Sequence, residues 1–206
     1  MAKKGLWLLF ALLAIAVGLY PAIYFKVDRS FGLLSSKPVE LLADNLWNIG
    51  FYMHIVFGGI SLLTGWTQFS PRIRNNNIAL HKKLGKVYIF SVTLSSIAAV
   101  YIGFFASGGL PASLGFISLG LIWLYTTLKA YSHIRNKQIV QHQKMMIYSY
   151  SACFAAVTLR IWLPLLMIMT GNFITAYTIV AWLCWIPNLV AAYLINRRFE
   201  TTRTLA

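Results

Sequence analysis

Apolar segments long enough to cross a membrane follow one another along the whole chain, separated by short polar stretches. A bilayer's hydrocarbon core, about 30 Å thick, is crossed by roughly 20 apolar residues in a helix. Five segments are about that long and one is somewhat shorter. We therefore expect an all-α integral membrane protein in a lipid bilayer, with six transmembrane helices spanning approximately residues 6–25, 49–69, 88–107, 113–131, 145–169 and 173–195.

The composition agrees with a single membrane domain. Hydrophobic residues make up 59% of the chain and charged residues 11%, which leaves too little polar surface for a soluble globule. The six spans and their connections use all of residues 1–206, so we predict one domain without a soluble catalytic module. The net charge of +14 would indicate nucleic acid for a soluble protein. In this chain the positions of the charges instead indicate how the helices are oriented in the membrane. We therefore expect no nucleic-acid partner.

Most of the 18 basic residues lie on one side of the predicted spans. Only Lys26, Arg29 and Lys37 lie on the other side, and Arg160 lies within a span. Basic residues in short loops mark the cytoplasmic side. We therefore predict a multi-pass protein of the bacterial inner (cytoplasmic) membrane, with both termini in the cytoplasm.

Small and polar residues follow one face of the central spans at the three- and four-residue spacing of a helix. In lipid, such residues collect where helices contact each other. Spans two to five are therefore predicted to form a four-helix bundle with a small and polar interior, with spans one and six outside it. The pattern in the second span consists of His54, Gly58, Ser61, Gly65 and Gln68, and that in the fifth of His142, Met146, Ser149, Cys153, Ala156 and Arg160.

Two ionisable residues lie deep in the outer half of the predicted bundle. Arg160 is about 13 Å from the outer end of its span and His54 about 9 Å, at 1.5 Å per residue. Ionisable residues within a membrane are costly and indicate a functional site. We expect His54 and Arg160 to share an outer polar pocket. In the alternative, Arg160 reaches outward and His54 donates to a backbone carbonyl.

Histidines also gather at the cytoplasmic end. His81 and His142 begin the third and fifth spans, and His133 closes the fourth. Two imidazoles that face each other across a helical bundle can ligate the iron of haem b. The same two histidines, with Met145 and Met146, offer a site for Cu(I), which favours soft ligands. The alternative for each of these residues is that it is simply solvated at the membrane interface. His133, in a polar loop, is the weakest ligand candidate.

Cys153 and Cys184 lie near the middle of the fifth and sixth spans, where a thiol ordinarily serves as a small apolar group. The sequence assigns no further role to this pair. It also contains no C-x-x-C-H haem attachment, P-loop or H-E-x-x-H motif. The chemistry therefore depends on the histidines and on Arg160.

A set of short motifs runs from residue 54 to about residue 164: His54-x3-Gly58, Gly65-x2-Gln68-Phe69, Arg72-x-Arg74, the run LHKKLGKVY at 80–88, His142-x2-Met145-Met146 and Thr158-Leu159-Arg160. In these motifs the chain resembles a bacterial membrane family catalogued as domain of unknown function 2306. The resemblance picks out the same His54, His81, His142 and Arg160, but implies no activity. A fainter likeness to b561-type membrane cytochromes implies two haems in a four-helix bundle. Because only one histidine lies at the outer end, we expect no second bis-histidine haem.

Three functions are compatible with these residues. In the first, which we favour, one haem b bound by His81 and His142 exchanges electrons with quinol or with a respiratory membrane complex. The second is a non-enzymatic assembly or metal-handling factor for respiratory complexes. The third is a small transporter that uses Arg160, although the sequence shows neither the inverted repeats nor the broken helices typical of that class.

Overall fold

The computed structural model describes residues 2–28 and 32–204, so the predicted outer residue Arg29 lies outside the described part. Within these residues the chain is helical, without strands. Six segments are long and apolar enough to cross a membrane: Gly5–Phe25, Asn45–Phe69, Ile78–Gly103, Gly109–Arg135, Ile139–Thr170 and Phe173–Arg198. The all-α, six-span prediction is confirmed.

Side-chain caps start several of the helices. The Asp44 carboxylate accepts hydrogen bonds from the amides of Leu46 and Trp47, and the Asn77 side chain accepts one from the amide of Leu80. The helices are α1 (Ala2–Leu19), α2 (Val39–Ala43), α3 (Asn45–Gly65), α4 (Pro71–Asn76), α5 (Ile78–Gly103), α6 (Gly109–Arg135), α7 (Ile139–Cys153), α8 (Ala155–Thr170), α9 (Phe173–Leu183) and α10 (Ile186–Thr204). The described residues also include the 3-10 helices η1 (Tyr20–Phe25), η2 (Gly32–Ser36) and η3 (Trp66–Phe69).

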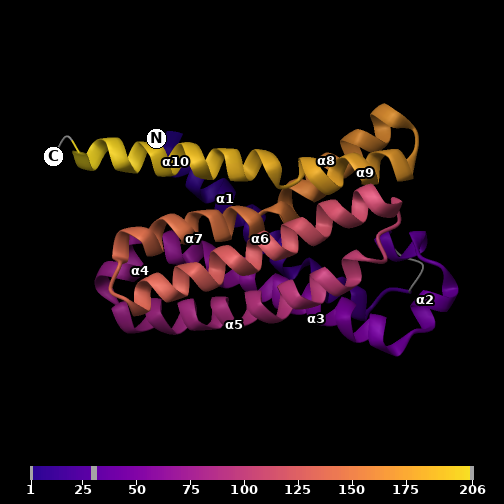
Figure 1. Ribbon diagram of the computed structural model, residues 1–206, viewed down its shortest axis with the longest axis horizontal. Coiled ribbons are helices and arrows are strands. Elements are labelled where there is room, and N and C mark those ends of the chain that lie inside the picture. Colours follow the sequence, from indigo (N-terminus) through magenta and orange to yellow (C-terminus); the bar gives the residue numbers. More distant parts are fainter. Residues whose placement is uncertain (1, 29–31, 205–206) are drawn as a thin grey trace.

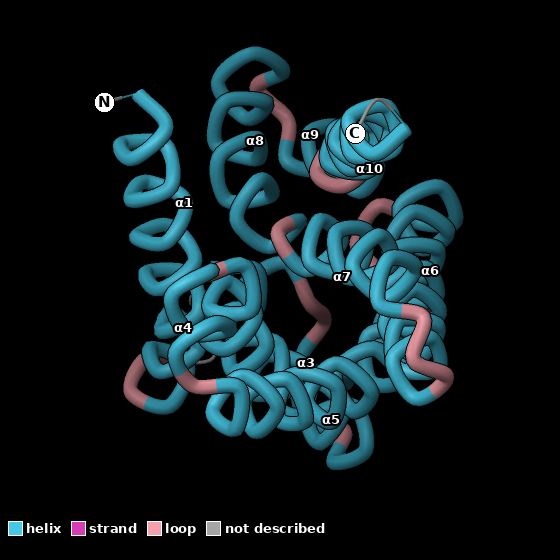
Figure 2. The backbone as a smooth tube through the Cα atoms, turned by 90° about the vertical axis from the view of Figure 1, so that its left-hand side faces the viewer, coloured by secondary structure: helices cyan, strands magenta, loops and turns pink. Residues whose placement is uncertain are grey.

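Helices α3, α5, α6 and α7 form the predicted four-helix bundle, and α1, α8 and α10 lie outside it (Figure 2). Both ends of the chain lie at one end of the molecule, together with α4 and the turn between α6 and α7 (Figure 1). We call this the basic end, because α4, the start of α5, the α6–α7 turn and the segments near the two chain ends together carry most of the basic residues. The end that carries α2 and the α8–α9 turn is called the far end.

The fifth and sixth spans are broken helices, so the expectation from the sequence that no span is broken is wrong. The break at Phe154 separates α7 from α8, and the break after Leu183 separates α9 from α10. Pro187 has no amide hydrogen to donate to the Leu183 carbonyl, which explains the second break. At the first break, the Asn188 side-chain amide donates to the Ser151 carbonyl at 3.3 Å, and a side chain inserted in this way kinks a helix. Only α7 of the fifth span therefore belongs to the bundle, while α8 packs against α9.

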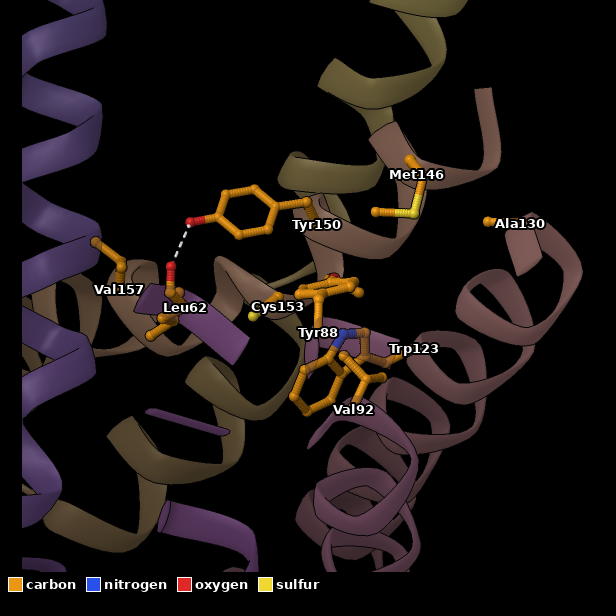
Figure 3. Close-up of a cluster of buried hydrophobic side chains, with 10 residues drawn as sticks. Leu62, Tyr88, Val92, Trp123, Ala130, Met146, Tyr150, Cys153 and Val157 are labelled. Carbon is orange, nitrogen blue, oxygen red and sulfur yellow. Dashed lines mark hydrogen bonds between the residues drawn. The ribbon is translucent and has the colours of Figure 1, made fainter. Parts of the chain in front are cut away.

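The bundle interior combines aromatic packing with a chain of buried hydroxyls. Tyr88, Trp123 and Tyr150 lie in the largest cluster of buried side chains, and the Tyr150 hydroxyl donates to the Leu62 carbonyl at 3.2 Å (Figure 3). The Tyr88 hydroxyl lies 2.7 Å from Ser149 Oγ, which lies 2.6 Å from Thr127 Oγ1. Thr127 in turn donates to a helix carbonyl, so these hydroxyls have partners within the membrane. The two cysteines of the chain, Cys153 and Cys184, are buried free thiols.

Candidate functional sites at the two ends of the bundle

A cavity of about 1170 Å³ lies at the basic end, among η3, α4, α5, α6 and α7. Its deeper wall is mainly apolar and includes Ile89, Met146 and Ile147. None of the described residues that line this cavity carries a carboxylate. The basic side chains on its wall are Arg74, Lys82, Lys86, Arg135 and Lys144. The cavity therefore suits an apolar molecule that carries negative charge.

His81 and His142 both line this basic-end cavity, so the structure brings the two predicted ligands to one site. The Nδ1 atom of His142 lies 2.9 Å from the Ala130 carbonyl oxygen. Because a carbonyl only accepts, Nδ1 carries the hydrogen and the other ring nitrogen, Nε2, keeps its lone pair. The Nδ1 atom of His81 is buried without a hydrogen-bond partner. His133 does not line the cavity, and its half-buried ring hydrogen-bonds to the Gln138 side chain.

The described residues contain no group of three or more His, Cys, Asp and Glu side chains arranged to hold a metal ion. A metal in the basic-end cavity would therefore depend on the two imidazoles, with the thioether of Met146 as a third donor. Met145, the other methionine proposed from the sequence, does not line the cavity and packs against the bundle core.

A second cavity, of about 230 Å³, lies at the far end, between the bundle and the segments α1, η1, η2, α8 and α9. His54 and Arg160 both line it, as the helical spacing predicts. His54 Nδ1 lies 3.1 Å from the Ser95 carbonyl oxygen, and Ser95 Oγ donates back to the His54 carbonyl at 2.9 Å. The imidazole therefore also makes the backbone hydrogen bond of the alternative interpretation. These two bonds fix the ring of His54 against α5.

Arg160 is turned toward η1 of the first span. Its guanidinium lies over the Tyr20 ring, 4.5 Å from the ring centroid, which is a cation–π arrangement. One terminal nitrogen donates to the Ala156 carbonyl at 2.8 Å, while Nε is buried without a partner. The side chain therefore stays in the interior and does not reach out to the surface.

Trp47, which the sequence places near the mouth of this outer pocket, lines the far-end cavity, and the structure adds Lys37 to it. The Lys37 ammonium donates to the Phe105 carbonyl, and burial lowers the pKa of Lys37 to about 8. Trp47 stacks on Phe51 at 5.3 Å between ring centroids, and its indole N–H is buried without a partner. The sequence analysis treated Lys37 only as a loop residue. Its one available signal was its position among the few basic residues on that side of the membrane.

These features define the class: a multi-pass helical membrane protein with a polar cavity at each end of a central bundle. A family model described as predicted membrane protein (DUF2306) matches residues 51–196, and the chain belongs to this family. No curated protein and no solved structure matches the chain. The comparisons give no support to the fainter b561 likeness, and the family description assigns no activity.

Proposed function

We propose that the protein binds one haem b in the basic-end cavity and takes part in membrane electron transfer. The observation that carries the proposal is the pair of imidazoles on α5 and α7. Both line the same cavity, His142 keeps Nε2 available, and His81 has a buried ring nitrogen without a partner. Paired histidines from facing helices are a common way to hold haem iron within a bundle.

The rest of the basic-end cavity fits the chemistry of haem. Its apolar wall suits the macrocycle, and the surrounding lysines and arginines suit the two propionates. The volume of about 1170 Å³ is slightly above that of ordinary ligand pockets, which run from about 300 to 1,000 Å³, so the cavity is large enough for a haem-sized molecule. The Ala130 carbonyl orients the His142 ring, as outer partners do for metal-bound histidines. When bound, haem would supply one-electron chemistry, and quinol or a respiratory membrane complex would be the electron partner.

The haem proposal predicts that two variants lose the visible absorption of the bound haem. Purified protein should show b-type absorption bands in the visible region after reduction. His81→Ala and His142→Ala should each abolish these bands, because one of the two imidazoles that would hold the haem is removed, while the variant still inserts into the membrane. His133→Ala is the matched control and should keep the bands, because its ring lies outside the cavity. Colourless wild-type protein from cells supplied with abundant haem would rule out this proposal.

The second candidate function is that of a copper-handling or assembly factor for respiratory complexes. The observation that favours it is Met146, whose thioether lines the same cavity as the two histidines. Measuring copper and haem in the same purified proteins distinguishes the two functions. Copper retained by colourless wild-type protein and lost in Met146→Leu would favour the metal-handling factor, whereas haem bands that survive Met146→Leu favour electron transfer.

The small-transporter hypothesis receives one piece of support from the fold. Discontinuous helices form substrate sites in many transporters, and the fifth and sixth spans are both interrupted. The two breaks lie in adjacent spans of one half of the chain, however, and the sequence gives no signal of an inverted repeat. Transport therefore ranks behind the two functions assigned to the basic-end cavity.

We also propose that the membrane is the bacterial inner membrane and that the basic end faces the cytoplasm. The positive-inside rule and the shared location of both termini support this orientation. A reporter that is active only in the periplasm should stay silent when fused after Arg198 and become active when inserted next to Lys37. Activity after Arg198 would reverse the orientation.

A further inference from the structure

We propose that the far-end cavity binds the carboxylate head of an amphiphilic molecule, with Arg160 and the indole N–H of Trp47 as donors to its oxygens. This ligand differs from the haem proposed for the basic end. The proposal therefore does not depend on the proposed function.

The first argument is charge. Arg160 lies within a membrane span, where a cation is costly, and Lys37 adds a second basic group to the same cavity. No aspartate or glutamate occurs among the residues described on its wall. The Tyr20 ring and the Ala156 carbonyl offset part of the charge of Arg160, but neither carries a negative charge. An anion in the cavity would complete the compensation.

The second argument is the pair of buried donors that have no acceptor. Trp47 is only 2% exposed, and its Nε1 has no hydrogen-bond partner. The Nε of Arg160 is in the same state, and both side chains line the cavity. Buried N–H groups are nearly always paired in folded proteins. A carboxylate has two oxygens that accept from such donors, and it forms stronger hydrogen bonds to them than a neutral carbonyl does.

The third argument is size and lining. The volume of about 230 Å³ equals roughly eight water molecules at about 30 Å³ each. This space holds a head group and a few carbons, but not a whole lipid. The remaining wall is rich in apolar side chains such as Phe51, Phe116 and Leu119. The matching ligand therefore has an apolar body directly attached to its acidic head.

The two cavities are far apart along the bundle. Ser95, which bonds to His54 at the far-end cavity, follows His81 in α5 by 14 residues, or about 21 Å along the helix axis. Neither ligand touches the other. Loss of one site therefore leaves the other intact, and the two proposals fail independently.

The test uses the full chain in nanodiscs of zwitterionic lipid and laurate labelled with ¹³C at its carboxyl carbon. Bound laurate should give a carboxyl resonance separate from that of laurate in the lipid. Arg160→Gln should weaken binding at least tenfold, because the positive charge is removed. Trp47→Phe should weaken it about threefold, because only the N–H is removed and an aromatic ring still stacks on Phe51. Lys26→Gln, a change at an exposed residue of the same end, should bind as the wild type does.

Two competitors identify the source of the carboxylate. Displacement of laurate by benzoate would support the site and assign it to small free carboxylates, whereas resistance to benzoate would assign it to long-chain ones. 1-Dodecanol has the same chain without the charge and should compete at least tenfold more weakly than unlabelled laurate. Equal competition by dodecanol, no separate resonance with wild-type protein, or unchanged binding in Trp47→Phe would each overturn the proposal. The comparison of Trp47→Phe with the wild type can still be made if Arg160→Gln fails to fold.

Discussion

Replacing Gly65 with alanine should lower the free energy of unfolding by about 3 kcal/mol, the upper end of the usual cost of overpacking a core. A Cβ at this position would lie 2.2 Å from Tyr150 Cε2 and 2.8 Å from Tyr88 Cε2. Neither ring can move easily, because both hydroxyls are hydrogen-bonded and both side chains are buried. α3 would have to move away from α5 and α7. Thermal unfolding in detergent measures the effect.

The matched control is Gly5→Ala in α1. A Cβ at Gly5 would meet nothing within 4 Å, and alanine favours a helix by up to about 1 kcal/mol over glycine. This variant should therefore be as stable as the wild type or slightly more so. If Gly65→Ala unfolded at the same temperature as Gly5→Ala, the close packing of α3 against the two tyrosine rings would be wrong.

Replacing Asn188 with leucine should cost about 2 kcal/mol, because partly buried carbonyls at the two helix breaks lose a donor. The Asn188 amide nitrogen lies 3.3 Å from the Ser151 carbonyl oxygen, 3.0 Å from that of Cys184 and 3.1 Å from Thr158 Oγ1. The Cys184 carbonyl keeps the Thr158 hydroxyl as a donor, so the expected loss corresponds to about one polar group, at Ser151, left without a partner at a cost of about 1–3 kcal/mol. Leucine has a similar volume, so the packing is largely retained and the loss reports on hydrogen bonding.

Hydrogen exchange adds a local readout to the unfolding measurement for Asn188→Leu. The amides just after Phe154 should exchange faster in the variant, since the first break is no longer held. Asn76→Leu, at an exposed position of α4, is the control and should change stability by less than about 0.5 kcal/mol. Equal unfolding temperatures for the two variants would show that Asn188 does not hold the breaks together.

The bundle follows from the sequence because helical spacing alone selects the buried face. The pattern that includes Ser61 and Gly65 turns these residues inward, and both are buried. The start of the third helix does not follow from hydropathy. The apolar stretch begins at Tyr88, but the helix begins at Ile78, because Asn77 caps it and a helix continues through polar residues when its backbone is paired.

The candidate sites were predictable where they depend on position along a helix. His81 and His142 start helices that run from the same end, so their shared cavity follows from topology. The helix breaks were not predictable, because the contact between Asn188 and Ser151 joins two different spans. Lys37 was missed for a related reason. Its place in the far-end cavity depends on how a loop folds back over the bundle, and loops have no periodicity from which this can be read.

The contacts of Asn188 place both helix breaks at one point, with Ser151 just before the first and Cys184 at the second. The hairpin of α8 and α9 is thus an arm joined to α7 and α10 at one pivot, and it is held against the bundle where α9 packs on α6 and Trp182 donates to the Pro111 carbonyl. Arg160 is carried on this arm, six residues beyond Phe154, whereas His54 stands on α3 of the bundle. Those six residues span about 9 Å, so a tilt of about 10° at the pivot displaces the Arg160 backbone by about 1.5 Å. The angle at this pivot therefore contributes to the width of the far-end cavity.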